Sequence, residues 1–262
     1  MAYTARVTER EQPSKVMLRG SGKGVWGHSE KGEGVHGETN SDTFAAVTAV
    51  QLNKTTTNNV VGVWGHSEKG EGVHGETNSD TFAAVTGIQL NPNTNAAGIY
   101  GKGKVAGHFE GKLEVTGDIL LLGPGQDFAE DFDISTSALD EIEPGTVMVL
   151  NEKGTVEPNY QAYDKKVAGI ISGACGYRPG IVLGRQECQS TRMPIALMGK
   201  VYCKVDASNS SIQIGDLLTT SPKKGHAMKA DDPYKAFGTV IGKALGSIKE
   251  GLGIIPVLVA LQ

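Results

Sequence analysis

The sequence has few cysteines, few aromatic residues and no long apolar run, and each shortage excludes a class of protein. Its three cysteines, Cys175, Cys188 and Cys203, form no CxxC pair and are odd in number, which argues against a disulfide framework and a zinc site. No run of 18 or more apolar residues is present, so no membrane span is expected. The start, MAYTARVTEREQPSK, lacks an apolar centre, so we expect no signal peptide and synthesis in the cytoplasm.

An excess of positive charge is also lacking. The 25 Lys and Arg residues are outnumbered by 29 Asp and Glu residues, and the net charge is −4. Nucleic-acid binding requires clustered Lys and Arg, and surface binding to membranes requires a basic amphipathic stretch. We therefore expect no nucleic-acid partner and no membrane insertion.

Glycine is abundant instead. The chain has 36 glycines in 262 residues, about twice the usual share, without the Gly-X-Y period of collagen. This composition indicates many tight turns and close backbone contacts.

The glycines are concentrated in a repeat. The 25-residue segment GVWGHSEKGEGVHGETNSDTFAAVT begins at Gly24 and again, letter for letter, at Gly62, an offset of 38 residues. A partial third copy begins with GIYG at 98–101, and within each full copy the GVWG unit is followed ten residues later by GVHG. Two identical segments fit two identical environments, so we expect the surroundings to repeat as well.

Each unit is typical of a short strand bounded by glycine turns, which predicts a β-helix or solenoid-like stalk. Single-chain solenoids need roughly three or more stacked repeats with caps, and this segment has two and a half. Identical neighbouring chains wrapped around one axis can supply the missing burial. We therefore predict a homotrimer, although symmetry alone favours a dimer.

The remainder of the chain has conventional strand patterns. The fold class expected is all-β: a polar N-terminal segment over 1–22, a repeat β-stalk over 23–123 and a compact β-domain over 124–262. The N-terminal segment is either a frayed terminus or a short attachment peptide. At most one short helix is expected, in TSALDEI. The strands predicted for the last domain cover residues 146–150, 167–172, 193–205, 211–221, 238–245 and 253–261.

Two series of motifs resemble a known class of proteins. The Gly-Val-aromatic-Gly units and VAGHFEGKLEVTGDI resemble the stalks of phage tail fibres and tail spikes, and of related trimeric proteins from bacterial contractile injection particles. The block through DFAEDFD, YDKKVAGIISG, ALMGKVYCKV, IGDLLTTS and GHAMKA to GKAL resembles the β-rich C-terminal domain of such fibres. That block is more distantly similar to the chaperone and autoprocessing domains of phage appendages, but no autoprocessing residue set is matched.

The resemblance implies a trimeric fibre or spike component of a virion or an extracellular phage-like particle. It also implies a baseplate or tail partner at the N-terminal segment, and a C-terminal domain that recognises a cell-surface glycan. Two alternatives remain open. The protein could be a tailspike that depolymerises surface glycan, or its C-terminal domain could serve only to register three chains during assembly.

Two sets of repeated side chains are candidate binding residues. Three imidazoles per layer of a trimer, from His28, His36, His66 or His74, could hold a metal, or these residues could simply be outward turn residues. Trp26 and Trp64 could stack on a sugar ring, or they could fill the stalk interior.

The acidic segment GQDFAEDFD is the candidate for catalysis. It places Asp127, Glu130, Asp131 and Asp133 close together, and glycoside hydrolysis requires paired carboxylates. The alternative is a solvated domain junction. GKALGSIKEGLG lacks the order of a phosphate-binding loop, and no nucleophile and base pair is recognisable. We therefore expect no cofactor and no enzymatic activity.

Overall fold

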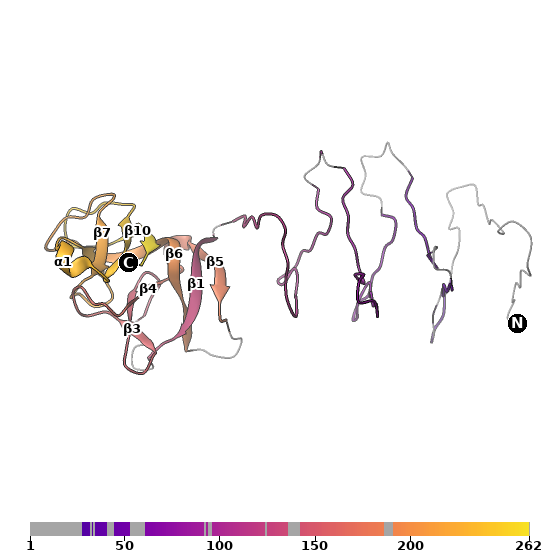
Figure 1. Ribbon diagram of the computed structural model, residues 1–262, viewed down its shortest axis with the longest axis horizontal. Helices are drawn as coiled ribbons and strands as arrows, with labels where there is room; N and C mark the ends of the chain where they lie inside the picture. The colour runs from indigo at the N-terminus through magenta and orange to yellow at the C-terminus, as the bar shows by residue number, and fades with distance from the viewer. Residues whose placement is uncertain are drawn as a thin grey trace, which may run out of the picture. The chain divides into compact units, whose positions relative to one another are not determined.

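The computed structural model describes residues 28–31, 33, 35–40, 45–52, 61–91, 93, 96–123, 125–135, 142–185 and 191–261. The chain divides into two units, Met1–His108 and Phe109–Gln262 (Figure 1). The segment over 1–22 and most of TSALDEI lie outside the described residues. Among the described residues, no helix is long and apolar enough to cross a membrane.

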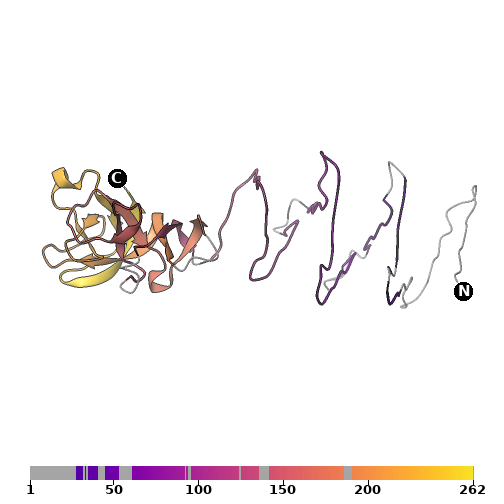
Figure 2. The same cartoon turned by 90° about the horizontal axis from the view of Figure 1, so that it is seen from below.

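The first unit contains the repeats. Its described residues run back and forth in extended passes (Figures 1 and 2). No strand is assigned to the part of residues 28–108 that the structure describes, and every described residue there is exposed. A β-solenoid formed by one chain is therefore not shown.

Local contacts in the repeats recur as the sequence does. A Cβ atom at Gly37 would lie 2.5 Å from Cγ2 of Val47, and one at Gly75, in the next copy, would lie 2.6 Å from Cγ2 of Val85. Both positions need glycine because a neighbouring pass approaches so closely. This contact of the first copy thus recurs at the equivalent position of the second.

The second unit confirms the all-β class. Its ten strands belong to one hydrogen-bonded sheet system. The strands are β1 (Gly125–Asp133), β2 (Val147–Leu150), β3 (Val156–Pro158), β4 (Val167–Ile171), β5 (Arg178–Leu183), β6 (Arg192–Asp206), β7 (Leu217–Thr220), β8 (Ala227–Lys229), β9 (Val240–Ala244) and β10 (Leu252–Ala260).

Strand β6, with 15 residues, is shared by two closed rings of strands. Its second half pairs with β10 on one edge and with β8 on the other, and the order β10-β9-β7-β8-β6 closes into a barrel. Its first half pairs with β1 and β4. The order β1-β6-β4-β2-β3 closes through the parallel bridge between Ile134 and Val156.

At Gly199, β6 has a partner strand on each edge. This residue is opposite Asp127 of β1 and also opposite Val259 of β10. Its φ is +104°, and a Cβ there would lie 2.6 Å from the carbonyl oxygen of Gln126. Only glycine combines this backbone conformation with so close an approach.

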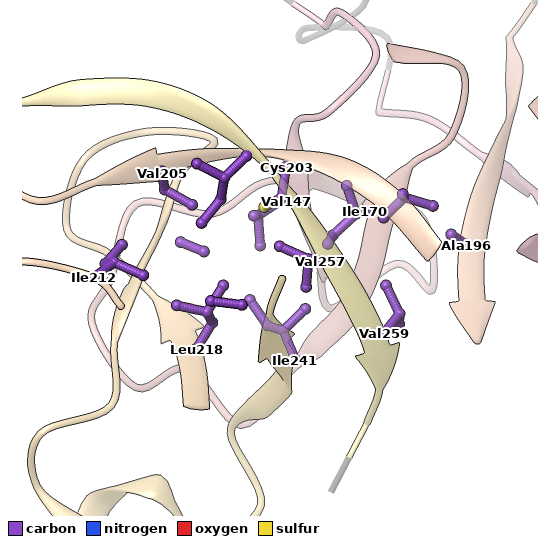
Figure 3. Packing of buried hydrophobic residues seen from close by; sticks show 14 of the residues in the cluster. Val147, Ile170, Ala196, Cys203, Val205, Ile212, Leu218, Ile241, Val257 and Val259 are labelled. Atoms are coloured by element: carbon purple, nitrogen blue, oxygen red, sulfur yellow. The ribbon is translucent and has the colours of Figure 1, made fainter. Parts of the chain in front are cut away.

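The domain has two apolar clusters, and the one in the barrel also includes Val147 of β2 and Ile170 of β4. The barrel cluster includes Val205, Leu218, Ile241 and Val257, whose side chains converge between the strands (Figure 3). The other cluster consists of Ile134, Ile142, Met148, Val156, Ala168, Ile171 and Ile195. In the second half of β6, Val201, Cys203 and Val205 are buried and the residues between them are only partly buried, which is the period-2 pattern of a strand with one face in the core.

The described residues contain little helix. Helix α1 (Pro233–Ala236) begins at Asp232, whose carboxylate accepts hydrogen bonds from the backbone N–H groups of Tyr234 and Lys235. A single 3-10 turn, η2 (Ala174–Gly176), precedes β5.

We predict that Gly199→Ala lowers the free energy of unfolding by about 2–4 kcal/mol, from left-handed strain and the clash with the β1 backbone. Chemical denaturation of the full chain measures it. The matched control is Gly154→Ala, because Gly154 also has a positive φ, +75°, but a Cβ there meets nothing within 4 Å. An equal loss in both variants would show that contact with β1 does not matter.

Candidate functional site

The acidic segment forms strand β1, in which two aspartates are more buried than the phenylalanines. Asp127, Ala129 and Asp131 are buried, whereas Phe128 and Phe132 are only partly buried. Asp127 is 5% exposed and Asp131 is 6% exposed. The segment is therefore an internal strand with two inward carboxylates, and the solvated junction expected as the alternative is not observed.

Asp127 is only partly satisfied by its surroundings. Its Oδ1 accepts a hydrogen bond of 3.0 Å from Oγ of Ser172, which follows β4. Its Oδ2 is buried without a hydrogen-bond partner among the described residues. Burial raises the pKa of Asp127, and the hydrogen bond from Ser172 offsets part of that effect.

Arginines hold the other two aspartates of β1. Nε of Arg185 lies 3.2 Å from Oδ2 of Asp131, and Nε of Arg192 lies 3.3 Å from Oδ1 of Asp133. Arg192 also donates a hydrogen bond of 2.6 Å to the backbone carbonyl of Asp131. These contacts tie Arg185 and Arg192 to β1.

The two buried carboxylates are not placed as a hydrolytic pair. Asp127 and Asp131 are four residues apart on one face of a strand, a separation of about 13 Å at 3.3 Å per residue. Retaining and inverting glycosidases need about 5–9.5 Å between their carboxyl groups. Glu130 is on the opposite face of β1, away from both aspartates.

Two of the four candidate metal ligands contact a carboxylate within their own copy. Nδ1 of His36 lies 2.7 Å from Oε2 of Glu33, and His74 makes the equivalent contact with Glu71. His28 and His66 are exposed. Among the described residues, no group of three or more His, Cys, Asp or Glu side chains is arranged to hold a metal.

The structure describes one of the two candidate tryptophans. Trp26 lies outside the described residues, whereas Trp64 is 77% exposed. Exposure is compatible with stacking on a sugar and equally with contact between chains. Of the cysteines, Cys175 is exposed and Cys203 is buried, and both are free thiols; Cys188 is not described. Burial raises the pKa of Cys203 strongly, so this thiol is unreactive.

A polar hollow in the second unit was not foreseen from the sequence. It has a volume of about 170 Å³, which corresponds to roughly six water molecules. Tyr163 lines it with a left-handed backbone, φ 55°, a conformation that costs about 1–3 kcal/mol outside glycine. The other lining residues are Asp206, Asn209, Ser210, Met228, Lys229 and Asp231.

The geometry of this hollow suits a small hydroxyl-rich ligand. The Tyr163 hydroxyl accepts a hydrogen bond of 3.1 Å from the backbone N–H of Asp232, which fixes the ring. Although burial acts to raise the pKa of Asp206, hydrogen bonds from Ser208 and Ser221 outweigh it and lower the pKa. A charged carboxylate, an amide and a hydroxyl beside an aromatic ring can accept and donate hydrogen bonds to a sugar.

Comparison with known proteins gives weak likenesses only. No protein-family model matches the chain, and no curated protein matches it. It is similar to a C-terminal fragment of bacteriophage phi29 gene product 12, at 16% identity and a TM-score of 0.34, over 51% of this chain and 100% of the fragment.

Two further phi29 structures have comparable scores. The pre-mature gene product 12 has 14% identity and a TM-score of 0.37, over 57% of this chain and 23% of its own. The N base of head fibre gp8.5 has 16% identity and a TM-score of 0.26, over 51% of this chain and 89% of its own. TM-scores this low do not establish a common fold.

We predict that the stability of the Asp127→Asn variant, relative to that of wild type, increases as pH rises. Because burial raises the pKa of Asp127, its contribution to stability is present below the ordinary aspartate pKa of 3.8 and is lost as pH rises through the folded-state value. At pH 7 the variant removes a desolvated charge, and its unfolding midpoint in denaturant should equal or exceed that of wild type.

The matched control is Asp206→Asn. The pKa of Asp206 is lowered, so its contribution is present above the ordinary pKa and is lost on acidification. This variant should be destabilised at pH 7 and approach wild type in acid. If both variants lost stability in parallel at pH 7, the assignment of Asp127 as a costly buried charge would be wrong.

Proposed function

We propose that this chain is a structural protein of a phage or phage-like contractile particle. In this proposal it forms a homotrimeric tail fibre or spike component and presents its C-terminal domain to a cell-surface glycan. The observation that carries the proposal is the exposure of large apolar side chains throughout the identical repeats. Their number and their repetition are best explained by cover from identical chains.

The exposed apolar side chains follow the repeats. Trp64 is 77% exposed and Phe82 is also 77% exposed, although both are rigid aromatics that usually bury much of their surface. Soluble monomers rarely expose contiguous apolar surface of this kind. The others between residues 35 and 105 are Val35, Val47, Val50, Leu52, Val61, Val63, Val73, Val85, Ile88, Leu90, Ile99, Tyr100 and Val105.

In a trimer around one axis, these side chains would pack against the same side chains of the other two chains. Every turn of such a shaft has the same surroundings, so an identical segment fits at each level. Extended passes from neighbouring chains would also supply partners for the backbone groups that a lone chain leaves outside any strand. The strands expected over 23–123 would then form only in the oligomer.

A shaft of this kind gives weak binding sites the benefit of multivalency. Three sites on one stiff support bind a repetitive surface far more tightly than one site does. The hollow at Tyr163 is the candidate sugar site in the C-terminal domain, and attachment to the particle would be through residues 1–22, as the resemblance to phage fibres implies. No observation favours a depolymerase or a pure assembly cap over this role.

We expect purified full-length chain to have a three-chain mass in light scattering coupled to size exclusion. Negative-stain images of the same peak should show a rod with a knob. The physical reason is the apolar surface of the repeats, which a single chain does not cover. A one-chain mass at micromolar concentration would end the fibre proposal.

We expect the full chain to bind a subset of bacterial surface glycans on an array, and the double variant Asn209→Ala, Ser210→Ala to lose at least tenfold in apparent affinity. Both side chains line the hollow. Lys249→Ala is the control, because Lys249 is not a lining residue. Undiminished binding by the double variant would place the sugar site elsewhere.

A further inference from the structure

Strand β5 is the exception to the closed topology of the second unit. The other nine strands lie in the two rings, whereas β5 pairs in parallel with β1 only, among the described residues. Its second edge is therefore available for another strand. Proteins usually cover or charge such an edge, because an exposed edge is a template for pairing with another chain.

Two of the three exposed residues of β5 are apolar. Ile181 is 38% exposed and Leu183 is 44% exposed, and they lie on one side because strand residues alternate. The intervening Val182 is less exposed. The third exposed residue, Arg178, places a charge only at the start of the strand. The apolar remainder of the edge is typical of a strand that is covered in an assembly.

The leucines before β1 enlarge the same surface. Leu121 lies beside β5, since a Cβ at Gly180 would be 3.4 Å from its Cδ1. Leu120 and Leu122 are 78% and 87% exposed. A hollow of about 350 Å³ lies between these three leucines and Arg178, Pro179 and Gly180 at the start of β5.

A second hollow adjoins this surface. It has a volume of about 220 Å³, and its lining residues include Leu121, Asp127, Phe128 and Ile181.

We propose that the β5 edge, with Leu120 and Leu122, is the contact between copies of this chain in the C-terminal domain, and that its occupant is the same region of a neighbouring copy. The inference rests on the homo-oligomer of the proposed function and adds the surface that joins the domains. Leu120 and Leu122 of one copy cover Ile181 and Leu183 of the next.

One observation favours a second copy over an unrelated partner. Exposed apolar residues continue along the chain from the repeats through Phe109, Leu113 and Val115 to Leu122, so the segment that needs cover in the repeats continues without a break in sequence to the leucines beside β5.

Thiol accessibility in the assembled full chain tests the proposal. Leu122→Cys and Phe237→Cys are compared in a background carrying Cys175→Ser and Cys188→Ser, and the buried Cys203 is retained. Leu122 and Phe237 are matched, at 87% and 86% exposed in the single chain, but Phe237 follows helix α1 and is not part of the surface. We expect the Leu122→Cys thiol to react with a maleimide at least tenfold more slowly in the oligomer.

The outcomes separate this inference from the proposed function. A multi-chain mass with equal labelling rates at both positions would overturn the β5 contact and leave the homo-oligomer standing. A one-chain mass would overturn both. Leu183→Lys gives a second measurement on the edge strand itself: it should raise the dissociation constant of the oligomer at least tenfold, whereas Phe237→Lys should leave it unchanged.

Discussion

Strand β6 forms hydrogen bonds along both edges, and the two rings of the C-terminal domain begin and end on it. It supplies residues to both apolar clusters, so the two halves of the domain cannot separate without breaking this one strand's ladders. At Gly199 the strand has β1 on one edge and β10 on the other, where a side chain would collide with β1. The sheet therefore behaves as one cooperative unit.

The repeats have the opposite character. They have no strand ladder or buried cluster in the part of the chain that is described, and they expose their apolar side chains at equivalent positions in each copy. Under the proposed homo-oligomer, the interactions that hold such a segment would come from neighbouring chains. The identity of the two copies and the exposure of their side chains would then have the same explanation, which is that each copy fits the same neighbour.

The strands at 146–150, 167–172, 193–205, 238–245 and 253–261 were predictable because their Val and Ile content matches strand preference. Of the stretch over 211–221, only Leu217–Thr220 is a strand. Strand β1 was missed because its inward residues are aspartates, which the usual alternation places outside. Strand β5 was missed because Pro179 and Gly180 signal a turn. The hollow at Tyr163 joins residues from 163 to 231, and sequence spacing carries no signal of that proximity.

The shared strand also sets an order of events during synthesis. The 45 residues between Asp206 and Leu252 separate the end of β6 from its partner β10. At about 5–20 residues per second, one edge of β6 stays unpaired for roughly 2–9 s after the strand has been made. In that interval the valines of the barrel are open to solvent and to neighbouring nascent chains. Factors that shield a strand edge should therefore matter more to the yield of this domain than to its final stability.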